Sequence, residues 1–335
     1  MTLNKVFIIA EAGVNHNGSI KKALKLVDIA KKSGADAVKF QSFIASEEIS
    51  KFAPKAKYQM TTTNPNESQL DMIKKLELSI KEQKKIKSYC DNLKIEFISS
   101  PFGLTSINIL KKLKIKTVKI PSPEINNLPY LLEISRKFSK IILSTGMSNI
   151  KEINTAIKIL KRNKKKDISI LHCISSYPTK LEDLNLNAIH TLRKNFNNII
   201  GFSDHSLGIE GSLLAVAAGA RIIEKHFTIN KKLNGPDHKA SLSPEQLNEL
   251  VKKIRQVEQI LGDGIKKPQK SEIENIKVVR KSIVARELIK IGEKFTKKNI
   301  TTKRPGTGIS PMKWKNMIGK KSKYNYQKDE IIKKI

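Results

Sequence analysis

The alternation of short apolar runs with helical patterns constrains the fold of this chain more than any other feature of its sequence. Eight runs rich in Ile, Val and Phe recur before residue 230, and segments with the period of an amphipathic helix separate them. The expected strands are Val6–Ala10, Ala37–Gln41, Glu96–Ser99, Thr117–Ile120, Ile141–Thr145, Ile168–Cys173, Ile199–Ser203 and Ile222–His226. Eight strand–helix units predict an α/β protein with a closed (β/α)8 TIM barrel rather than an open doubly wound sheet.

The first unit shows the pattern in detail. A strand at Val6–Ala10 leads into a polar turn over residues 11–18, and Ser19 is a suitable N-cap for the helix that follows. The residues expected on the buried face of this helix are Ile20, Leu24, Val27 and Ala30. Neither GxGxxG nor GxxxxGK[ST] occurs in the chain, so the sequence does not support a nucleotide-binding fold.

The character of the chain changes after Leu261–Gly264. Residues 265–279 are polar and basic and contain Pro268, which is typical of a linker. Short β-like pieces follow at Ser282–Ala285, Ile291–Lys294 and Ile300–Thr302. We therefore expect a barrel domain over residues 1–264 and a small β-rich domain over 280–335. A domain of this size is small for an independent core, so we expect it to pack on a partner surface.

The charge of the chain suggests a different class of protein. The formal net charge is +33, from 64 Lys and Arg against 31 Asp and Glu, as in many nucleic-acid-binding proteins. The basic residues are mostly lysines spread along helical segments, aromatic residues make up only 5%, and no helix-turn-helix, zinc-finger or base-stacking motif occurs. A solvated, lysine-rich surface is therefore favoured, and no nucleic-acid partner is expected.

The cysteines and apolar runs indicate the compartment. Cys90 and Cys173 form no CxxC motif, which fits a reducing environment rather than a disulfide framework. The apolar start Val6–Ala10 is too short for a signal peptide and runs into Glu11, and no apolar run approaches the roughly 18 residues of a membrane span. We expect a soluble cytoplasmic protein without a membrane partner.

Two of the expected strands lead into histidines. His205 follows the strand Ile199–Ser203, and His226 ends the strand Ile222–His226. In a parallel barrel these ends share one face, where two imidazoles can hold a divalent metal and leave positions open for substrate. Each histidine alone would more often be an ordinary hydrogen-bonded residue, but their paired placement favours a metal site.

Lysines and hydroxyls gather at the same end of the barrel. The period of a strand places Lys39 and Gln41 inside the barrel, with Val38 and Phe40 against the helices, and Lys119 holds an equivalent place two strands on. Ser100, Ser122, Ser144 and Thr145 close neighbouring strands. Because a buried lysine needs an anion, this pattern predicts a cup for a phosphate or carboxylate.

Several carboxylates lie at or just beyond strand ends: Glu11, Glu124, Asp204, Glu224 and Asp237. One or two of them can act as a general base or orient hydroxyls of a sugar, but the pattern alone does not rank them. Cys173 also ends a strand, where a buried thiol beside Ile174 is more often packing than a nucleophile.

A series of motifs in chain order resembles the sialic acid synthases of the NeuB type. The motifs are Glu11–Gly18, Val38–Gln41, Ser99–Phe102, Lys119–Ser122, Leu143–Met147, Leu171–Cys173 with Tyr177–Thr179, Gly201–His205, Glu224–Thr228 and Gly235–Asp237. Further along, Thr302–Gly308 resembles the C-terminal antifreeze-like (SAF) domain of these enzymes. The similarity runs nearly from end to end.

The resemblance implies condensation of phosphoenolpyruvate with an N-acetylated mannosamine and water, giving a nine-carbon 2-keto acid and phosphate. It implies that His205 and His226 bind Mn2+, and that Arg304 reaches the partner's sugar across a domain-swapped homodimer. Phosphoenolpyruvate would be held by Lys39, Lys119, Ser100, Ser122, Ser144 and Ser203. The sugar-binding positions would be Glu11, Gln41, Tyr177, Glu124 and Asp237. Glu124, Lys119 and Glu11 would be catalytic, with Glu124 handling the proton.

The leading hypothesis is therefore an N-acetylneuraminate synthase that uses N-acetylmannosamine. The alternative is an N,N'-diacetyllegionaminate synthase, which uses 2,4-diacetamido-2,4,6-trideoxymannose and shares nearly all these motifs; pseudaminic acid synthases fit less well. Pro123 and Ser175 depart from the family pattern, where relatives have Gly and, in some cases, Asn. Two further hypotheses are a nucleic-acid-binding barrel, suggested by charge alone, and a Schiff-base aldolase, against which the paired histidines argue.

Overall fold

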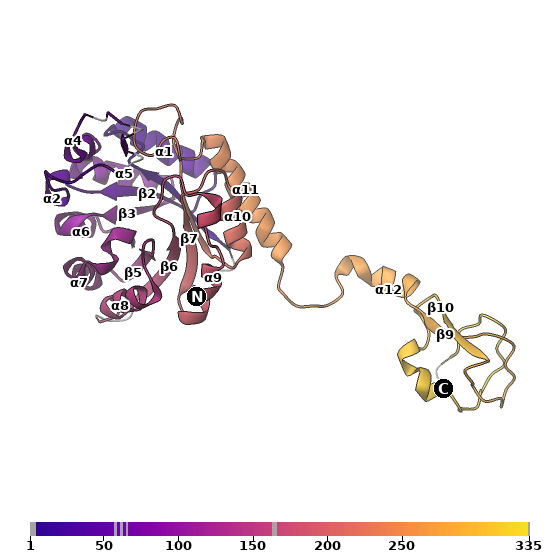
Figure 1. Cartoon of the computed structure of the whole chain (residues 1–335). Helices are drawn as coiled ribbons and strands as arrows, with labels where there is room; N and C mark the ends of the chain where they lie inside the picture. Colours follow the sequence, from indigo (N-terminus) through magenta and orange to yellow (C-terminus); the bar gives the residue numbers. More distant parts are fainter. Residues whose placement is uncertain (1–4, 57–58, 61–62, 65, 163–165, 334–335) are drawn as a thin grey trace. The chain divides into compact units, whose positions relative to one another are not determined.

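The computed structural model describes residues 5–56, 59–60, 63–64, 66–162 and 166–333. The chain divides into two compact units, Met1–Gly262 and Asp263–Ile335 (Figure 1). The outer ends of the two domains expected from the sequence, residues 1–4 and 334–335, lie outside the described residues.

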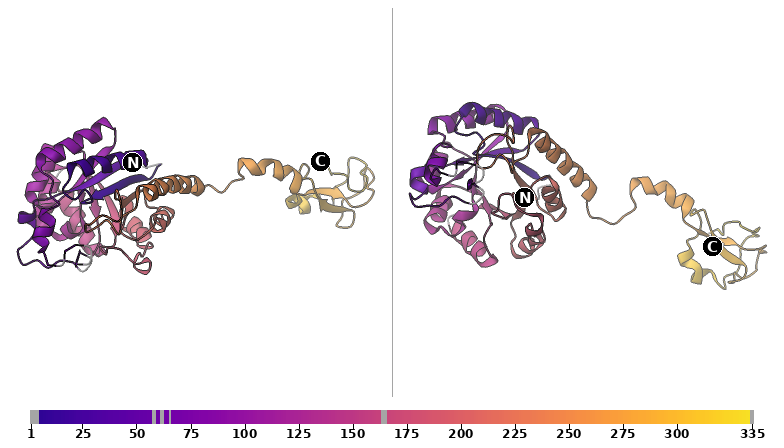
Figure 2. Two further views of the ribbon diagram at one scale, coloured as in Figure 1. Left: turned by 90° about the horizontal axis from the view of Figure 1, so that it is seen from above. Right: turned by 45° about the horizontal axis from the view of Figure 1, so that its top comes forward.

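The first unit is a closed barrel of eight parallel strands, in the order in which they occur along the chain (Figure 2). The strands are β1 (Phe7–Gly13), β2 (Ala37–Ser42), β3 (Glu96–Pro101), β4 (Thr117–Ile120), β5 (Lys140–Ser144), β6 (Asp167–Cys173), β7 (Ile199–Asp204) and β8 (Ile222–His226). The predicted TIM barrel is confirmed. Most strands begin or end one or two residues away from the expected positions, and the largest difference is in β1. It continues to Gly13 through a register shift after Glu11, so Glu11 lies in the strand and not in the expected turn.

Helices surround the barrel (Figures 1 and 2). They are α1 (Ile20–Lys32), α2 (Ala45–Glu48), α4 (Gln69–Lys74), α5 (Ile80–Asn92), α6 (Gly103–Lys112), η1 (Ser122–Asn126), α7 (Leu128–Lys137), α8 (Ile150–Leu160), η2 (Leu181–Asp183), α9 (Ala188–Asn195), α10 (Glu210–Ala217) and α11 (Pro244–Leu261). Helix α1 begins as expected, because the Ser19 hydroxyl accepts a hydrogen bond from the Lys22 amide. Val27 and Ala30 are buried on its inner face, with Ile20 and Leu24 partly buried beside them.

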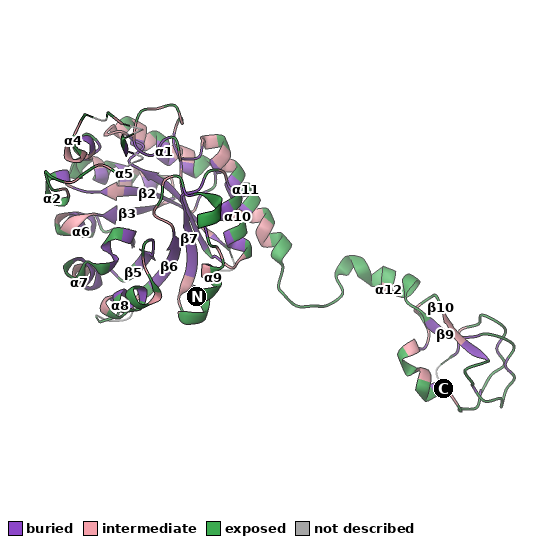
Figure 3. Ribbon diagram, in the orientation of Figure 1, coloured by how far each residue is buried: buried purple, intermediate pink, exposed green. Residues whose placement is uncertain are grey.

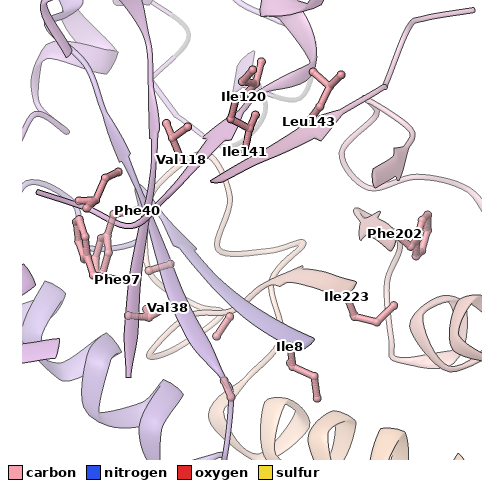
Figure 4. Close-up of a cluster of buried hydrophobic side chains, with 14 of the residues drawn as sticks. Ile8, Val38, Phe40, Phe97, Val118, Ile120, Ile141, Leu143, Phe202 and Ile223 are labelled. Carbon is pink, nitrogen blue, oxygen red and sulfur yellow. The ribbon is translucent and has the colours of Figure 1, made fainter. Parts of the chain in front are cut away.

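The strands separate two apolar layers, because alternate side chains point to opposite faces. The layer between strands and helices contains Val38, Phe40, Ile120, Phe202 and Ile223 (Figure 4). The layer inside the barrel consists of Ile9, Ala37, Ile98, Ile142, Leu171 and Ile222. Purple strands in Figure 3 show how completely the sheet is buried.

The inner apolar layer determines where the polar groups lie. Two residues beyond its members, toward the carboxyl end of each strand, the same inward face carries Glu11, Lys39, Ser100, Ser144, Cys173 and Glu224. A stacked layer of side chains is characteristic of this barrel type, and the active sites of such enzymes lie at the carboxyl ends of the strands. The apolar layer therefore forms the floor of a polar cavity.

The second unit has its own core. It contains η3 (Lys270–Glu272), α12 (Ile273–Val279), β9 (Ser282–Ala285), β10 (Ile300–Lys303), η4 (Pro311–Lys313) and α13 (Trp314–Met317). Strands β9 and β10 pair in antiparallel fashion, and Ile283, Phe295 and Tyr326 are among the buried residues that pack beside them. The expectation that this tail is too small for an independent core is therefore wrong, because long loops fold back over the hairpin.

Two local expectations for the second unit also differ from the structure. Residues 265–279 are almost fully exposed, but they include the helical segments η3 and α12 instead of a plain linker. A capping box between Gln269 and Glu272 begins this helical stretch. Ile291–Lys294 forms a turn rather than a strand, with only an isolated bridge from Lys294 to Lys321. Within the described part of the chain, no helix is both long enough and apolar enough to span a membrane.

Two buried histidines lie in the loops that follow β1 and β8, and one of them, His238, connects these loops. His238 Nδ1 lies 2.6 Å from Thr228 Oγ1, and its Nε2 lies 3.1 Å from Asn17 Oδ1. His16 Nδ1 accepts a hydrogen bond of 3.1 Å from the Gly18 amide. Burial lowers the pKa of His16 and of His238 to about 4. Both side chains are therefore neutral at pH 7.

We expect the barrel to lose stability as the pH falls from about 6.5 to about 4. The folded pKa of each histidine lies below its unfolded value, so the unfolded chain takes up protons first and is favoured in this window. The loss for His16 is roughly 3 kcal/mol at most. Thermal unfolding at pH 7, 5.5 and 4.5 measures it. The variant His16→Gln with His238→Gln should show a flatter profile, and an unchanged slope would contradict this account.

Candidate functional site

A cavity of about 390 Å³ opens at the carboxyl end of the barrel, and every strand or the loop after it contributes to its wall. Twelve residues expected from the sequence line it: Glu11, Lys39, Gln41, Ser100, Lys119, Ser122, Ser144, Tyr177, Ser203, His205, His226 and Asp237. The tertiary structure thus brings together side chains that span more than 200 positions of the chain.

Four ionisable side chains form a buried network at the base of the cavity. Lys39 Nζ lies 2.8 Å from Glu11 Oε1 and donates to Ser100 Oγ at 3.1 Å. Lys119 Nζ donates to both oxygens of Glu224, at 2.8 and 3.0 Å. Lys39 Nζ also lies 3.9 Å from Glu224 Oε2, which joins the two pairs. Each of the four is at most 4% exposed, so neither sign of charge can rely on water.

The two carboxylates of this network differ in their proton affinity. Burial raises the pKa of Glu11 to about 7, against the opposing effect of Lys39. Burial also acts to raise the pKa of Glu224, but Lys119 and Lys39 outweigh it and lower that pKa to about 2. Glu224 therefore stays ionised beside the lysines, whereas Glu11 can gain or release a proton near neutral pH.

The two histidines lie side by side at the mouth of the network. Their ring centroids are 5.7 Å apart, and the Tyr177 ring lies 4.1 Å from that of His205. His205 Nδ1 lies 2.7 Å from the Ile174 carbonyl, which can only accept, so this nitrogen carries a proton and Nε2 is the ring nitrogen that can bind a metal once the ring is neutral. Burial acts to lower the pKa of His205, but Cys173 and the Ile174 carbonyl outweigh it and raise that pKa. Burial and the neighbouring His205 lower the pKa of His226, so its ring is neutral, the form that binds metals.

These residues fit a divalent cation. His226 Nδ1 and Glu11 Oε2 are buried atoms without a hydrogen-bond partner in the described part of the chain, and such orphaned atoms indicate a missing ligand. Within the described residues, no set of three or more His, Cys, Asp or Glu side chains is arranged around a common metal position. The protein would therefore supply two imidazoles, and the remaining positions would be open to substrate or water.

Glu224 was one of five carboxylates expected near strand ends, and the sequence patterns assigned no role to it. Its carboxylate accepts from Lys119 and from the Ser203 hydroxyl, which lies 2.9 Å away. The signal was present, since Glu224 shares the inward face of β8 with His226 two residues later. Cys173, expected to be packing, is buried but also lines the cavity, with its sulfur 3.8 Å from His205 Nδ1.

Three of the considered residues lie elsewhere. Glu124 is buried in η1 but is not one of the described residues that line the cavity, and its Oε2 accepts from Asn127 Nδ2 at 2.6 Å. Asp204 faces the helices, where it pairs with Lys225. Arg304 lies in the second unit, exposed, directly after β10. The catalytic role of Glu124 and the cross-dimer role of Arg304 stay predictions.

Comparison with known proteins identifies the family. The sequence model of the NeuB family matches residues 26–266, and that of the SAF domain matches residues 280–334. The chain belongs to the NeuB family. It is therefore an enzyme, a phosphoenolpyruvate-dependent synthase of the sialic acid type, and its C-terminal unit is a SAF domain.

Two curated relatives cover nearly the whole of this NeuB-family chain. It is 51% identical over 333 residues to the N,N'-diacetyllegionaminic acid synthase of Campylobacter jejuni. The match covers 99% of this chain and 100% of the relative. It is 44% identical over 323 residues to the enzyme of the same name from Legionella pneumophila, with 95% and 91% covered.

A solved structure supports the same fold. The N-acetylneuraminic acid synthetase of Leptospira borgpetersenii, crystallised with citrate, shares 38% of its residues and superposes with a TM-score of 0.72. The match covers 81% of this chain and 90% of that one. At this identity, the shared barrel reflects common family membership and not fold alone.

We expect Lys119→Met to destabilise the barrel by about 3–5 kcal/mol, because it leaves Glu224 as a buried carboxylate with only a distant lysine. Adding Glu224→Gln should recover most of this loss, since the uncompensated charge is then gone. Urea unfolding of the single and double variants measures the difference, with Lys112→Met on the exposed face of α6 as a control. Equal destabilisation of single and double variants would show that the two side chains are not coupled.

Proposed function

We propose that this NeuB-family enzyme joins carbon 3 of phosphoenolpyruvate to the aldehyde carbon of an open-chain N-acetylated mannosamine-type sugar. The products are a nine-carbon 2-keto acid and inorganic phosphate. The observation that carries the proposal is the single cavity in which Lys39 and Lys119 face the imidazoles of His205 and His226. This arrangement offers cationic groups for an enol phosphate beside ligands for a cation that binds an aldehyde.

In this proposal, the lysines and hydroxyls at the base hold phosphoenolpyruvate. Its carboxylate and phosphate take contacts that the lysines make with Glu11 and Glu224 in the free enzyme. Donors for the remaining oxygens are the hydroxyls of Ser100, Ser122, Ser144 and Ser203. Protonation of Glu11, whose pKa is about 7, would reduce the repulsion between the bound anion and this carboxylate.

The reaction moves two protons, and both come from water in the overall balance. As carbon 3 attacks, the aldehyde oxygen takes up one proton, and the water that adds to the cationic carbon 2 gives up its first proton. Loss of the second proton of that water to the leaving phosphate accompanies cleavage of the bond between carbon 2 and the phosphate oxygen. Glu11 is better placed than Glu124 to exchange these protons, since Glu11 lines the cavity and has a pKa of about 7. A divalent metal, Mn2+ in this proposal, would be held by His205 and His226 and would polarise the aldehyde when bound.

The sugar would occupy the outer part of the cavity, beside Gln41, Tyr177 and Asp237. We propose a homodimer in which Arg304 contacts the N-acetyl group of the partner's sugar. Its exposed position in the SAF domain leaves the side chain accessible for such a contact.

The favoured sugar is the 2,4-diacetamido-2,4,6-trideoxy compound. The two relatives at 51% and 44% identity carry the name of the corresponding synthase. Among the described residues of the cavity wall, the lysines are Lys39 and Lys119, both engaged by carboxylates, so no further cation is available for a sugar phosphate. Val14, Phe102 and Met147 add apolar wall that suits a methyl group. Unphosphorylated N-acetylmannosamine is the second candidate, favoured by the 38% identical synthetase.

Phosphate release distinguishes these sugars. The enzyme is incubated with phosphoenolpyruvate, Mn2+ and, separately, the diacetamido sugar, N-acetylmannosamine and its 6-phosphate. We expect the highest kcat/KM with the diacetamido sugar, at least about tenfold above N-acetylmannosamine, because contacts to a second acetamido group and a methyl group are worth 1–3 kcal/mol. Preference for the 6-phosphate would refute the assignment of the sugar. Absence of phosphate release with all three would refute the proposed reaction.

The metal site is tested by His205→Ala and His226→Ala. Each should lower kcat by at least about 100-fold and remove tight Mn2+ binding, because each deletes one of two imidazole ligands. Residues at the mouth add little to the core, so the thermal midpoint should change little. His190→Ala, on the exposed face of α9, is the matched control. Full activity in either mouth variant would eliminate the two-histidine site.

A further inference from the structure

An ion pair lies behind the two histidines, on the side of the sheet that faces the helices. Asp204 ends β7 directly before His205, and Lys225 lies in β8 directly before His226. The two residues are partners in the strand register, and Lys225 Nζ lies 2.8 Å from Asp204 Oδ2. Their side chains are 2% and 0% exposed, so the pair is fully removed from water.

Each polar atom of this pair is used. Asp204 Oδ1 accepts from the Ser206 amide at 2.9 Å and from its hydroxyl at 2.6 Å. Asp204 Oδ2 accepts from the Ser212 hydroxyl of α10 at 2.6 Å, in addition to Lys225. Lys225 Nζ also donates to the Ser206 carbonyl at 2.7 Å. The network therefore connects β7, β8, the loop after β7 and the first turns of α10.

The same contacts hold the backbone on both sides of His205. Asp204 precedes it, and Ser206, which follows it, is bound at its amide, hydroxyl and carbonyl. The His205 carbonyl itself accepts from the Thr179 amide at 2.9 Å. On β8, Lys225 directly precedes His226, and its side chain reaches across to the loop after β7. One cluster of hydrogen bonds thus links the backbone next to both imidazoles.

Stability alone does not account for an ion pair at this place. Many helix-facing positions of other strands carry apolar side chains, such as Phe40, Ile120 and Leu143 (Figure 4). Ser42, Ser99 and His172 are polar but form hydrogen bonds rather than an ion pair. A buried ion pair is often no more stabilising than apolar residues of similar size. Directional bonds from fixed donors, unlike apolar contacts, specify one arrangement of the groups that they join.

We infer that Asp204 and Lys225 are positioning residues that set the separation of His205 and His226, so that both imidazoles reach one divalent cation. This inference rests on the proposed metal-dependent function. The pair touches neither the cation nor the substrates, and it acts only through the strand ends. Groups that orient metal ligands from behind typically change metal affinity by 10–100-fold when they are removed.

The test replaces the pair by neutral side chains of similar size, Asp204→Asn with Lys225→Met. Mn2+ binding to the metal-free protein is followed by the electron paramagnetic resonance signal of the free ion, together with thermal unfolding. We expect a 10–100-fold higher Kd for Mn2+, with a thermal midpoint close to that of the control. The control is Asp36→Asn with Arg255→Met, which removes a 2.9 Å ion pair between residues 36 and 255, before β2 and within α11.

Unchanged Mn2+ affinity in the neutral pair variant, with tight binding by the parent enzyme, overturns the positioning role and leaves the proposed function intact. Failure of the parent enzyme itself to bind Mn2+ overturns both. If the neutral pair variant does not fold, the Mn2+ affinity of Lys225→Arg is measured instead. The guanidinium of this variant keeps the charge, but it is larger and planar and does not fit the place of the ammonium group between Asp204 Oδ2 and the Ser206 carbonyl without moving these groups. At least fivefold weaker Mn2+ binding supports the inference, and affinity equal to that of the parent overturns it.

Discussion

The burial of two lysines and two glutamates in the middle of the barrel is the constraint on which the rest of the structure depends. Lys39, Lys119, Glu11 and Glu224 are almost fully buried, so each needs an opposite charge within hydrogen-bonding distance. Strands β1, β2, β4 and β8 supply these groups, and only closure of the barrel brings all four to one point. Closure of the barrel therefore brings the four charged side chains together and also pairs each lysine with a glutamate.

In the proposed function, this arrangement would let the site bind a multiply charged anion without a large excess of positive charge. The lysines are held by carboxylates before substrate arrives, and one of these carboxylates, Glu11, has a pKa of about 7. A bound enol phosphate can then take over the lysine contacts while Glu11 accepts a proton. Glu224, whose pKa is about 2, stays ionised.

Strand β8 carries three successive ionisable side chains, which point to alternate sides of the sheet. Glu224 and His226 face the cavity, whereas Lys225 faces the helices and pairs with Asp204. One short strand thereby links the charged base of the cavity, the two imidazoles and the network behind them. A change in its register by one residue would exchange these sides and destroy all three features together.

The sequence alone determined the features that depend on local periodicity. The eight strands, the inward side of Lys39 and Gln41, the two histidines at strand ends and the Ser19 cap all follow from spacings of two or about 3.6 residues. Only the tertiary structure decided which inward groups meet. Glu224 pairs with Lys119, 105 positions away, Glu124 lies off the cavity wall, and the small C-terminal domain has its own core. These outcomes depend on distances across a closed barrel and between distant loops, which no local pattern encodes.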